Sequence, residues 1–175
     1  REEFNEGLSD WWELAGKPAT SSVYFSQEKE LYGHSFMADS YYNKTERCLI
    51  GKPFGHELNK IVEIDFFDHT RVRNAVYHLT FQSALDSFAR VDDGNYQKAI
   101  GVDTTFDSAH YSYKIGTLTR STDITRTYGW HTFKWDYTSG TEVKMYIDDQ
   151  LIATVPAKHF SYIEMGDYGA GGYNA

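Results

Sequence analysis

Three carboxylates lie close together in one segment of the sequence, at Glu63, Asp65 and Asp68. If the segment is a strand, Glu63 and Asp65 share a face, and a bulge before Asp68 would turn the third carboxylate onto that face as well. Two carboxyl groups about 5–5.5 Å apart can supply the nucleophile and the acid/base that cleave a glycosidic bond with retention. The spacing is therefore compatible with glycoside hydrolysis.

The same carboxylates also have non-catalytic interpretations. Acidic side chains on the open face of a sheet accept hydrogen bonds from sugar hydroxyls, or they are simply solvated. Arg71 and Arg73 follow closely in the sequence, and either could form an ion pair with Asp65 or Asp68. Catalysis, sugar binding and ion pairing therefore all stay open at this point.

Other kinds of site find little support in the sequence. Cys48 is the only cysteine, so no internal disulfide is expected, and the seven histidines form no zinc-binding motif. No nucleophile elbow, phosphate-binding loop or dinucleotide-binding motif occurs. The formal net charge of -8 argues against nucleic acid as a partner, and the apolar runs are too short to insert into a membrane.

The elements that would position these residues are predicted to be strands. Short runs with period-two alternation recur between turn-forming residues, and helical periodicity is hard to find. The predicted strands are 60–68, 75–82, 96–102, 110–115, 130–138, 142–148 and 151–155, of which the last three form a meander. Without linkers or crossover helices, residues 1–175 are expected to form a single antiparallel β-sandwich or jelly roll.

The same alternation separates core residues from outward-facing ones. Val62, Ile64 and Phe66 share one face of their strand, which leaves Glu63 and Asp65 on the other. Further core residues are predicted at Phe81, Phe133 and Trp135.

The chain is rich in aromatic residues, with 14 Tyr, 11 Phe and 4 Trp. Sugars bind proteins through aromatic rings that stack on their apolar faces and through a few polar groups that fix orientation. An acidic, all-β domain with this composition therefore favours glycan binding. The predicted sugar contacts are Glu63, Asp65, His78, Gln82, Tyr96, Tyr111, Tyr113 and Trp130.

Two segments resemble the concanavalin A-like lectin/glucanase superfamily. Residues 129–137, read together with 143–152, resemble a signature of these jelly rolls, and residues 62–68 resemble the carboxylate strand of the same superfamily. The resemblance organises residues from about 60 to 168 and implies a concanavalin A-like sandwich. Members include laminarinase-like glycoside hydrolases, polysaccharide lyases, lectins, laminin G-like domains and carbohydrate-binding modules.

The resemblance also implies roles for individual residues. On the pattern of laminarinase-like hydrolases, Glu63 would be the nucleophile, Asp65 its support and Asp68 the acid/base, at a position where the family has Glu. Many of these domains hold a structural Ca²⁺, and Asp167 is the residue that resembles its ligand.

We expect a non-catalytic carbohydrate-binding domain that binds an oligo- or polysaccharide in a concave groove. The acidity of the chain favours a neutral sugar. A laminarinase-like retaining glycoside hydrolase that uses the three carboxylates is one alternative, and a laminin G-like adhesion domain is another. The resemblance further implies an extracellular or cell-surface location, with the chain as a monomeric module of a larger protein.

Overall fold

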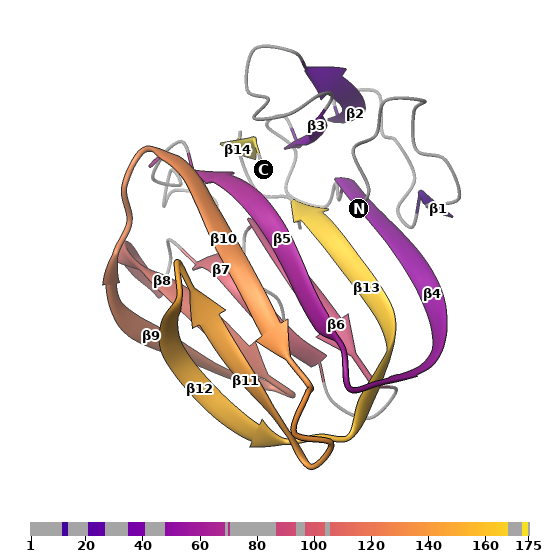
Figure 1. The fold of residues 1–175 in the computed structure, drawn as a ribbon. Helices are drawn as coiled ribbons and strands as arrows, with labels where there is room; N and C mark the ends of the chain where they lie inside the picture. Colours follow the sequence, from indigo (N-terminus) through magenta and orange to yellow (C-terminus); the bar gives the residue numbers. More distant parts are fainter. Residues whose placement is uncertain are drawn as a thin grey trace.

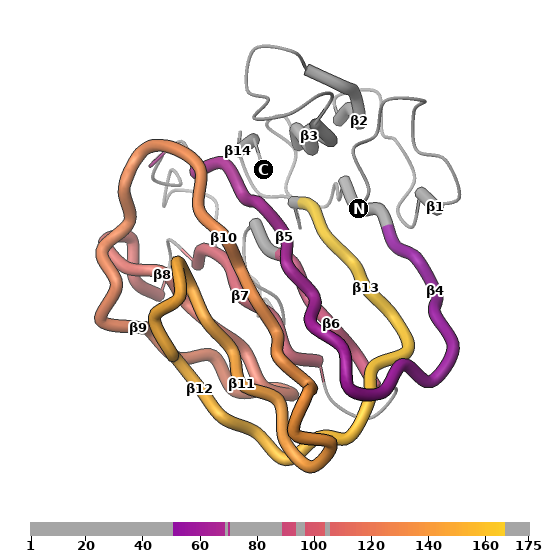
Figure 2. The backbone as a smooth tube through the Cα atoms, in the orientation of Figure 1, coloured from indigo at the N-terminus to yellow at the C-terminus, as the bar shows by residue number. Residues whose placement is uncertain are grey.

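The computed structural model is built from antiparallel strands (Figures 1 and 2). It describes residues 12–13, 21–26, 35–40, 48–68, 70, 87–93, 97–103, 106–167 and 173–174. Two sheets form a sandwich, which confirms the predicted fold class. Within the described part of the chain, no helix is long and apolar enough to cross a membrane.

The larger sheet has seven strands in the order β1-β4-β13-β6-β7-β8-β9. Their bounds are β1 Trp12–Glu13, β4 Cys48–Leu58, β13 His159–Asp167, β6 Ser87–Asp92, β7 Gln97–Asp103, β8 Asp107–Ile115 and β9 Leu118–Thr125. Every neighbouring pair is antiparallel. Strands β6 to β9 follow one another in the sequence, whereas β13 lies between β4 and β6, which are far from it in the sequence.

The second sheet has four strands in the order β12-β11-β10-β5 and lies in front of β6–β9 in Figure 1. Their bounds are β12 Gln150–Pro156, β11 Glu142–Ile147, β10 Gly129–Asp136 and β5 Ile61–Asp68. A third, three-stranded sheet contains β14 Tyr173–Asn174, β3 Ser35–Ser40 and β2 Ser21–Ser26.

The predicted meander of the last three strands is confirmed by β10, β11 and β12. Asp148 and Asp149 connect β11 to β12 with φ angles of 47° and 63°, as a tight turn of the type that suits twisted strands requires. Gly140, with φ of 70°, lies in the turn between β10 and β11. A Cβ at Gly140 would come within 3.2 Å of Asn59 Oδ1, so space as well as backbone conformation favours glycine.

The core lies between the two large sheets. Phe133, Trp135, Val143, Met145 and Ile147 from the four-stranded sheet are completely buried. Each contributes roughly 1.5–3 kcal/mol by leaving water. They pack against a set from the seven-stranded sheet that includes Val91, Ile100, Val102, Tyr111 and Ile163.

The alternation along β5 agrees with the prediction. Val62 and Phe66 are buried and Ile64 packs against the core, whereas Glu63 and Asp65 are exposed on the outer face. The strand therefore presents its two exposed carboxylates away from the core.

The predicted strands do not include β4, β6, β9 and β13 of the two large sheets, nor β2, β3 and β14 of the third sheet. β4 includes Gly51, Pro53 and Gly55, which are poor strand formers, and β9 is mostly polar. A register shift between Phe160 and Tyr162 interrupts the alternation in β13. The predicted strand 75–82 lies outside the described residues.

Candidate functional site

The register between β5 and β10 sets three outward-facing pairs side by side. Glu63 lies opposite Lys134, Asp65 lies opposite Thr132, and Phe67 lies opposite Trp130. Tyr146 on β11 lies opposite Lys134 on its other side. We call these seven outward residues, together with Tyr128, the four-strand face.

One half of the four-strand face is polar. Thr132 donates a hydrogen bond from Oγ1 to Asp65 Oδ1 at 2.9 Å, while no described residue donates one to the Glu63 carboxylate. The Lys134 ammonium donates to Asp149 and lies 4.8 Å from the centroid of the Tyr146 ring. The hydrogen bond to Asp149 raises the pKa of Lys134. The exposed carboxylates thus keep lone pairs available for the hydroxyl hydrogens of a ligand.

The other half of the four-strand face is aromatic. The Phe67 ring lies 5.1 Å from the Trp130 ring and 5.3 Å from the Tyr128 ring, in both cases edge to face. Tyr128 is 70% exposed, and Phe67 and Trp130 are partly exposed. Exposed rings of this kind, next to hydrogen-bonding side chains, form a surface on which a sugar ring can stack.

Asp68 does not join the other two carboxylates, so the expected three-carboxylate arrangement is wrong for this residue. The pairing of β5 with β10 is continuous from residue 61 to residue 68, with no bulge, and Asp68 therefore faces the interior with Val62 and Phe66. Its side chain is 2% exposed, on the opposite face from Glu63.

Arg126 forms an ion pair with the buried Asp68. The guanidinium donates from Nε to Oδ2 at 2.9 Å and from Nη2 to Oδ1 at 2.7 Å, and its Nη1 donates to the backbone carbonyl of Ser108. The two parallel bonds give the bidentate geometry in which Arg–carboxylate pairs are strongest. Asp68 is thereby committed to a structural ion pair between the two sheets.

Two of the predicted sugar contacts also face the interior. Tyr111 is completely buried, with its ring 5.8 Å from that of Phe133, and Tyr113 packs against the same core. Burial, and then the nearby Asp68 carboxylate, raise the pKa of Tyr111. Alternate residues of β8 share one face, which explains why both tyrosines turn inward together.

Several predicted residues lie outside the described part of the structure. These are His78, Gln82 and Tyr96, and the arginines at 71 and 73. The backbone of Asp167 ends β13, but its side chain is not among those described. Among the described residues, no three His, Cys, Asp or Glu side chains are grouped so as to hold a metal ion, and the calcium expectation stays a prediction.

His131 is a buried residue that ties β10 to the turn after β11. Its Nδ1 lies 2.6 Å from Asp148 Oδ2, and its Nε2 lies 2.9 Å from the carbonyl oxygen of Thr127. The other Asp148 oxygen accepts a hydrogen bond from the backbone N–H of Thr132. The signature residues His131 and Asp148 therefore position the strand that carries Trp130.

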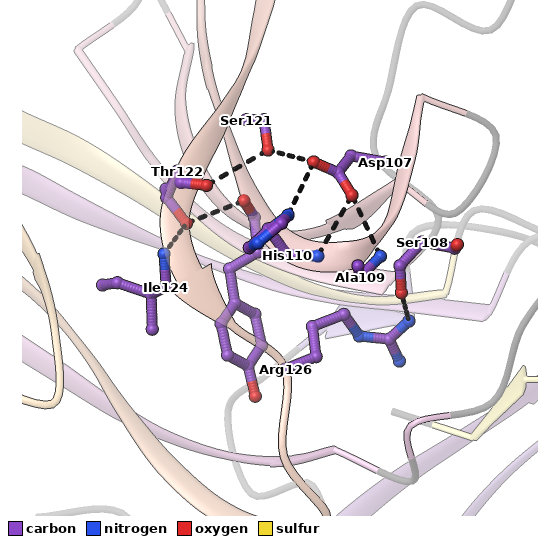
Figure 3. Close-up of polar contacts among 9 residues, drawn as sticks. Asp107, Ser108, Ala109, His110, Ser121, Thr122, Ile124 and Arg126 are labelled. Atoms are coloured by element: carbon purple, nitrogen blue, oxygen red, sulfur yellow. Dashed lines mark hydrogen bonds and ion pairs between the residues drawn. The ribbon is translucent and has the colours of Figure 1, made fainter.

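A Ser–Asp–His group not found from the sequence lies where β8 and β9 pair (Figure 3). Ser121 Oγ donates to Asp107 Oδ2 at 2.5 Å, and His110 Nδ1 lies 3.0 Å from the same oxygen. The hydrogen bond from Ser121 is the largest of the interactions that lower the pKa of Asp107 to about 2. Because the carboxylate stands between the hydroxyl and the imidazole, His110 is not placed to take a proton from Ser121, as nucleophilic catalysis would require.

Comparisons with known proteins place the fold among carbohydrate-related structures. No protein-family model matches the sequence, and no curated protein matches it. Among solved structures, the cellulose-induced protein Cip1 is similar with a TM-score of 0.63 at 12% identity, covering 99% of this chain and 91% of that chain. The Crh5 transglycosylase in complex with NAG is similar with a TM-score of 0.63 at 13% identity. The match covers 99% of this chain and 78% of that chain.

A glycoside hydrolase family 16 endo-glucanase from Bacteroides ovatus, in complex with G4G3G-2F-DNP, is similar with a TM-score of 0.57 at 11% identity. The match covers 99% of this chain and 94% of that one. At such low identity these similarities concern the fold, and they agree with the signature found in the sequence. The chain has a concanavalin A-like jelly-roll fold.

Proposed function

We propose that the chain is a non-catalytic carbohydrate-binding domain that holds a neutral oligo- or polysaccharide on the four-strand face. The observation that carries the proposal is the exposed aromatic cluster of Phe67, Tyr128 and Trp130 beside the carboxylate of Asp65. A pyranose ring would stack on the aromatic half, and its hydroxyls would donate to Asp65 and Glu63.

The arrangement of carboxylates supports binding over hydrolysis. Retaining hydrolysis needs a second carboxyl group about 5–5.5 Å from the nucleophile. Asp68, the candidate acid/base, faces the core and is bound by Arg126. Glu63 and Asp65 are left on an open face, where they suit the recognition of hydroxyl groups.

The class of ligand is supported by the proteins that share the fold. Their descriptions name a transglycosylase in complex with NAG and an endo-glucanase, both of which act on glycans. The two exposed carboxylates and the net charge of -8 favour a neutral glycan over an acidic one on this face. An extracellular module with a structural calcium at Asp167 is part of the same proposal.

A glycan array followed by calorimetry on the sugar that binds tests the proposal. Trp130→Ala is expected to lower the affinity about tenfold, because a stacked aromatic contact contributes on the order of 1.5 kcal/mol. Phe106→Ala is the matched control, since Phe106 is also an exposed aromatic but lies in the turn between β7 and β8. Repeating the array in the presence of EDTA tests whether binding depends on the proposed structural calcium.

Two outcomes would overturn the proposal. One is a wild-type protein that binds no neutral glycan on the array. The other is a Trp130→Ala variant that binds as tightly as the wild type. Release of reducing ends from laminarin or mixed-linkage β-glucan, lost in Glu63→Gln, would establish a hydrolase instead.

A further inference from the structure

His131 lies directly behind the aromatic half of the four-strand face. Its side chain points into the sandwich and is 10% exposed, whereas Trp130, the residue before it on β10, points outward. Residues 126–128 connect β9 to β10, and this connection carries the exposed ring of Tyr128. A group on the inward side of β10 is thus in contact with the segment that supplies an outward ring.

The Nδ1 atom of His131 is fixed as a hydrogen-bond donor. It lies 2.6 Å from Asp148 Oδ2, and a carboxylate oxygen can only accept. The Asp148 carboxylate is held in place in turn, because its Oδ1 accepts a hydrogen bond from the backbone N–H of Thr132 at 2.8 Å. The Nδ1 proton therefore stays in this contact, and a change in the protonation of the ring takes place at Nε2.

The Nε2 atom of His131 faces two oxygens of Thr127, and these oxygens suit opposite protonation states. The carbonyl oxygen of Thr127 lies 2.9 Å away and can only accept, so this contact requires a proton on Nε2. Thr127 Oγ1 lies 3.2 Å away and can donate, so this contact suits an Nε2 without a proton. The imidazolium thus matches the carbonyl, and the neutral ring matches the hydroxyl.

The Thr127 carbonyl belongs to the planar peptide unit that leads into Tyr128, so a rotation of this unit also moves Tyr128. On one side the chain is anchored, because the backbone N–H of Arg126 donates to a carbonyl oxygen of β8 at 2.9 Å. On the other side Gly129 has φ of 134°, a conformation that favours glycine. The Tyr128 ring itself meets the Phe67 ring edge to face. The hydrogen bond to the Thr127 carbonyl therefore helps to set where the Tyr128 ring lies.

The other titratable groups around the imidazole keep their charge near neutral pH. Tyr111 of β8 packs with its ring 5.2 Å from the imidazole, and burial raises the pKa of its hydroxyl, which stays neutral. Beyond Tyr111, Asp68 and Arg126 form their bidentate ion pair, in which the two charges offset each other. Asp148 contributes a carboxylate from the turn after β11. Histidine is the side chain in this set whose charge ordinarily changes between pH 5 and pH 8.

We propose that His131 is a pH-dependent switch for the aromatic half of the four-strand face. In the protonated state, Nε2 donates to the Thr127 carbonyl and holds Tyr128 against Phe67. When Nε2 gives its proton to solvent, it accepts a hydrogen bond from the Thr127 hydroxyl instead, the carbonyl is released and Tyr128 shifts. As a regulation of sugar binding, the switch rests on the proposed function, and the neutral glycan is then expected to bind more tightly in the protonated state.

Nuclear magnetic resonance of the imidazole nitrogens tests the switch without a sugar. In ¹⁵N-labelled protein, long-range ¹H–¹⁵N spectra recorded from pH 5 to pH 9 show which nitrogen of His131 carries a proton. We expect Nε2 to lose its proton within this range while Nδ1 keeps its own, and the Tyr128 backbone amide to shift with the same midpoint. His110 of β8 is the internal control, since its Nδ1 also lies against a carboxylate. Its titration should leave the Tyr128 amide unchanged.

Thr127→Val isolates the mechanism, because it keeps the carbonyl and removes the hydroxyl. Only the neutral state then loses a hydrogen bond, so the midpoint of the His131 titration should rise by about 0.5–1 pH unit, while that of His110 stays the same. Thr154→Val, at an exposed position of β12, is the matched control and should move neither midpoint. Thermal unfolding checks that both variants are folded.

Three outcomes would overturn the switch. The first is an Nε2 that keeps its proton, or lacks one, over the whole pH range. The second is a Tyr128 amide that does not follow the His131 titration, and the third is a folded Thr127→Val variant with an unchanged midpoint.

Calorimetry with the neutral glycan selected on the array tests the regulation separately. The affinity of the wild type is expected to fall at least threefold from pH 5.5 to pH 8.5, with the midpoint of the His131 titration, and the profile of Thr127→Val should move with its own midpoint. Equal affinity at both pH values would refute the regulation and leave sugar binding itself standing. If no neutral glycan binds at any pH, the proposed function fails, and the switch is decided by the spectra alone.

Discussion

The two outer faces of the sandwich carry similar types of charged side chain, but these side chains differ in how far they are exposed to solvent. On the four-strand face, Glu63 and Asp65 are exposed, and Lys134 binds an exposed aspartate. On the face of the seven-stranded sheet that points away from the core, which we call the seven-strand face, Glu164 and Lys114 are almost completely buried, and their neighbour Arg90 is held by two hydrogen bonds.

The difference indicates which face suits a sugar ligand. Exposed carboxylates beside aromatic rings can exchange water for sugar hydroxyls at little cost to the fold. Charges that are buried and already paired with other protein groups offer no such exchange with a ligand. The same difference predicts that substitutions on the two faces change stability by different amounts.

The largest effect on stability is expected from the buried ion pair between the faces. Asp68→Asn removes the charged carboxylate that accepts two hydrogen bonds from the buried Arg126 guanidinium, and it should lower the free energy of unfolding by about 3–5 kcal/mol. Urea denaturation at pH 7 measures this loss in the free energy of unfolding. Asp65→Asn, on the exposed side of the same strand, is the control and should change stability by less than about 0.5 kcal/mol. Equal effects of the two substitutions would contradict the assigned orientation of β5.

A smaller loss is expected when the ion pair of the seven-strand face is broken. Glu164→Gln removes the charge that Arg90 Nη2 binds and should cost about 1–3 kcal/mol, because Arg90 is partly solvated. Thermal or urea unfolding at pH 7 gives the value. A change below about 0.5 kcal/mol would mean that this face is as well solvated as the opposite one.

The Asp107 carboxylate provides a test that depends on pH. Its pKa of about 2 in the folded protein is below the value of about 3.9 in an unfolded chain, so its stabilisation is present above about pH 4 and is lost as the pH falls towards 2. Asp107→Asn should therefore cost about 1 kcal/mol at pH 7, with a difference from wild type that shrinks between pH 4 and pH 2. A difference that stays constant over this range would contradict the role given to Ser121.

The smallest effect is expected on the four-strand face. Lys134→Met removes the ion pair with Asp149, whose side chain is 87% exposed, and should change stability by about 0–1 kcal/mol. The loss should decrease further in high salt. If Lys134→Met cost as much as Glu164→Gln, the contrast between the faces would not hold.

Local alternation in the sequence was sufficient to predict part of this structure. The period-two pattern around Phe133 and Met145 identified the meander and its core side, and the same pattern identified Glu63 and Asp65 as outward residues. The error at Asp68 came from expecting a bulge, which the pairing with β10 does not contain.

The buried ion pairs and the orientation of β8 depend on contacts between distant parts of the chain, which local alternation does not predict. Asp68 and Arg126 are separated by 58 positions, and Arg90 and Glu164 by 74, so no local pattern connects them. The inward turn of Tyr111 likewise depends on which face of β8 meets the opposite sheet. Sequence composition indicated that aromatic residues were abundant but did not indicate which ones the sheets would leave exposed.

The central claim is that a neutral glycan binds on the four-strand face, and chemical-shift mapping tests it directly. The ¹⁵N-labelled protein would be titrated with the neutral oligosaccharide that binds best on the array. The account predicts that the largest shifts are at the Trp130 indole N–H and at the backbone amides of Asp65, Phe67 and Thr132. Shifts confined to β6, β7 and β8, with these four signals unchanged, would contradict it.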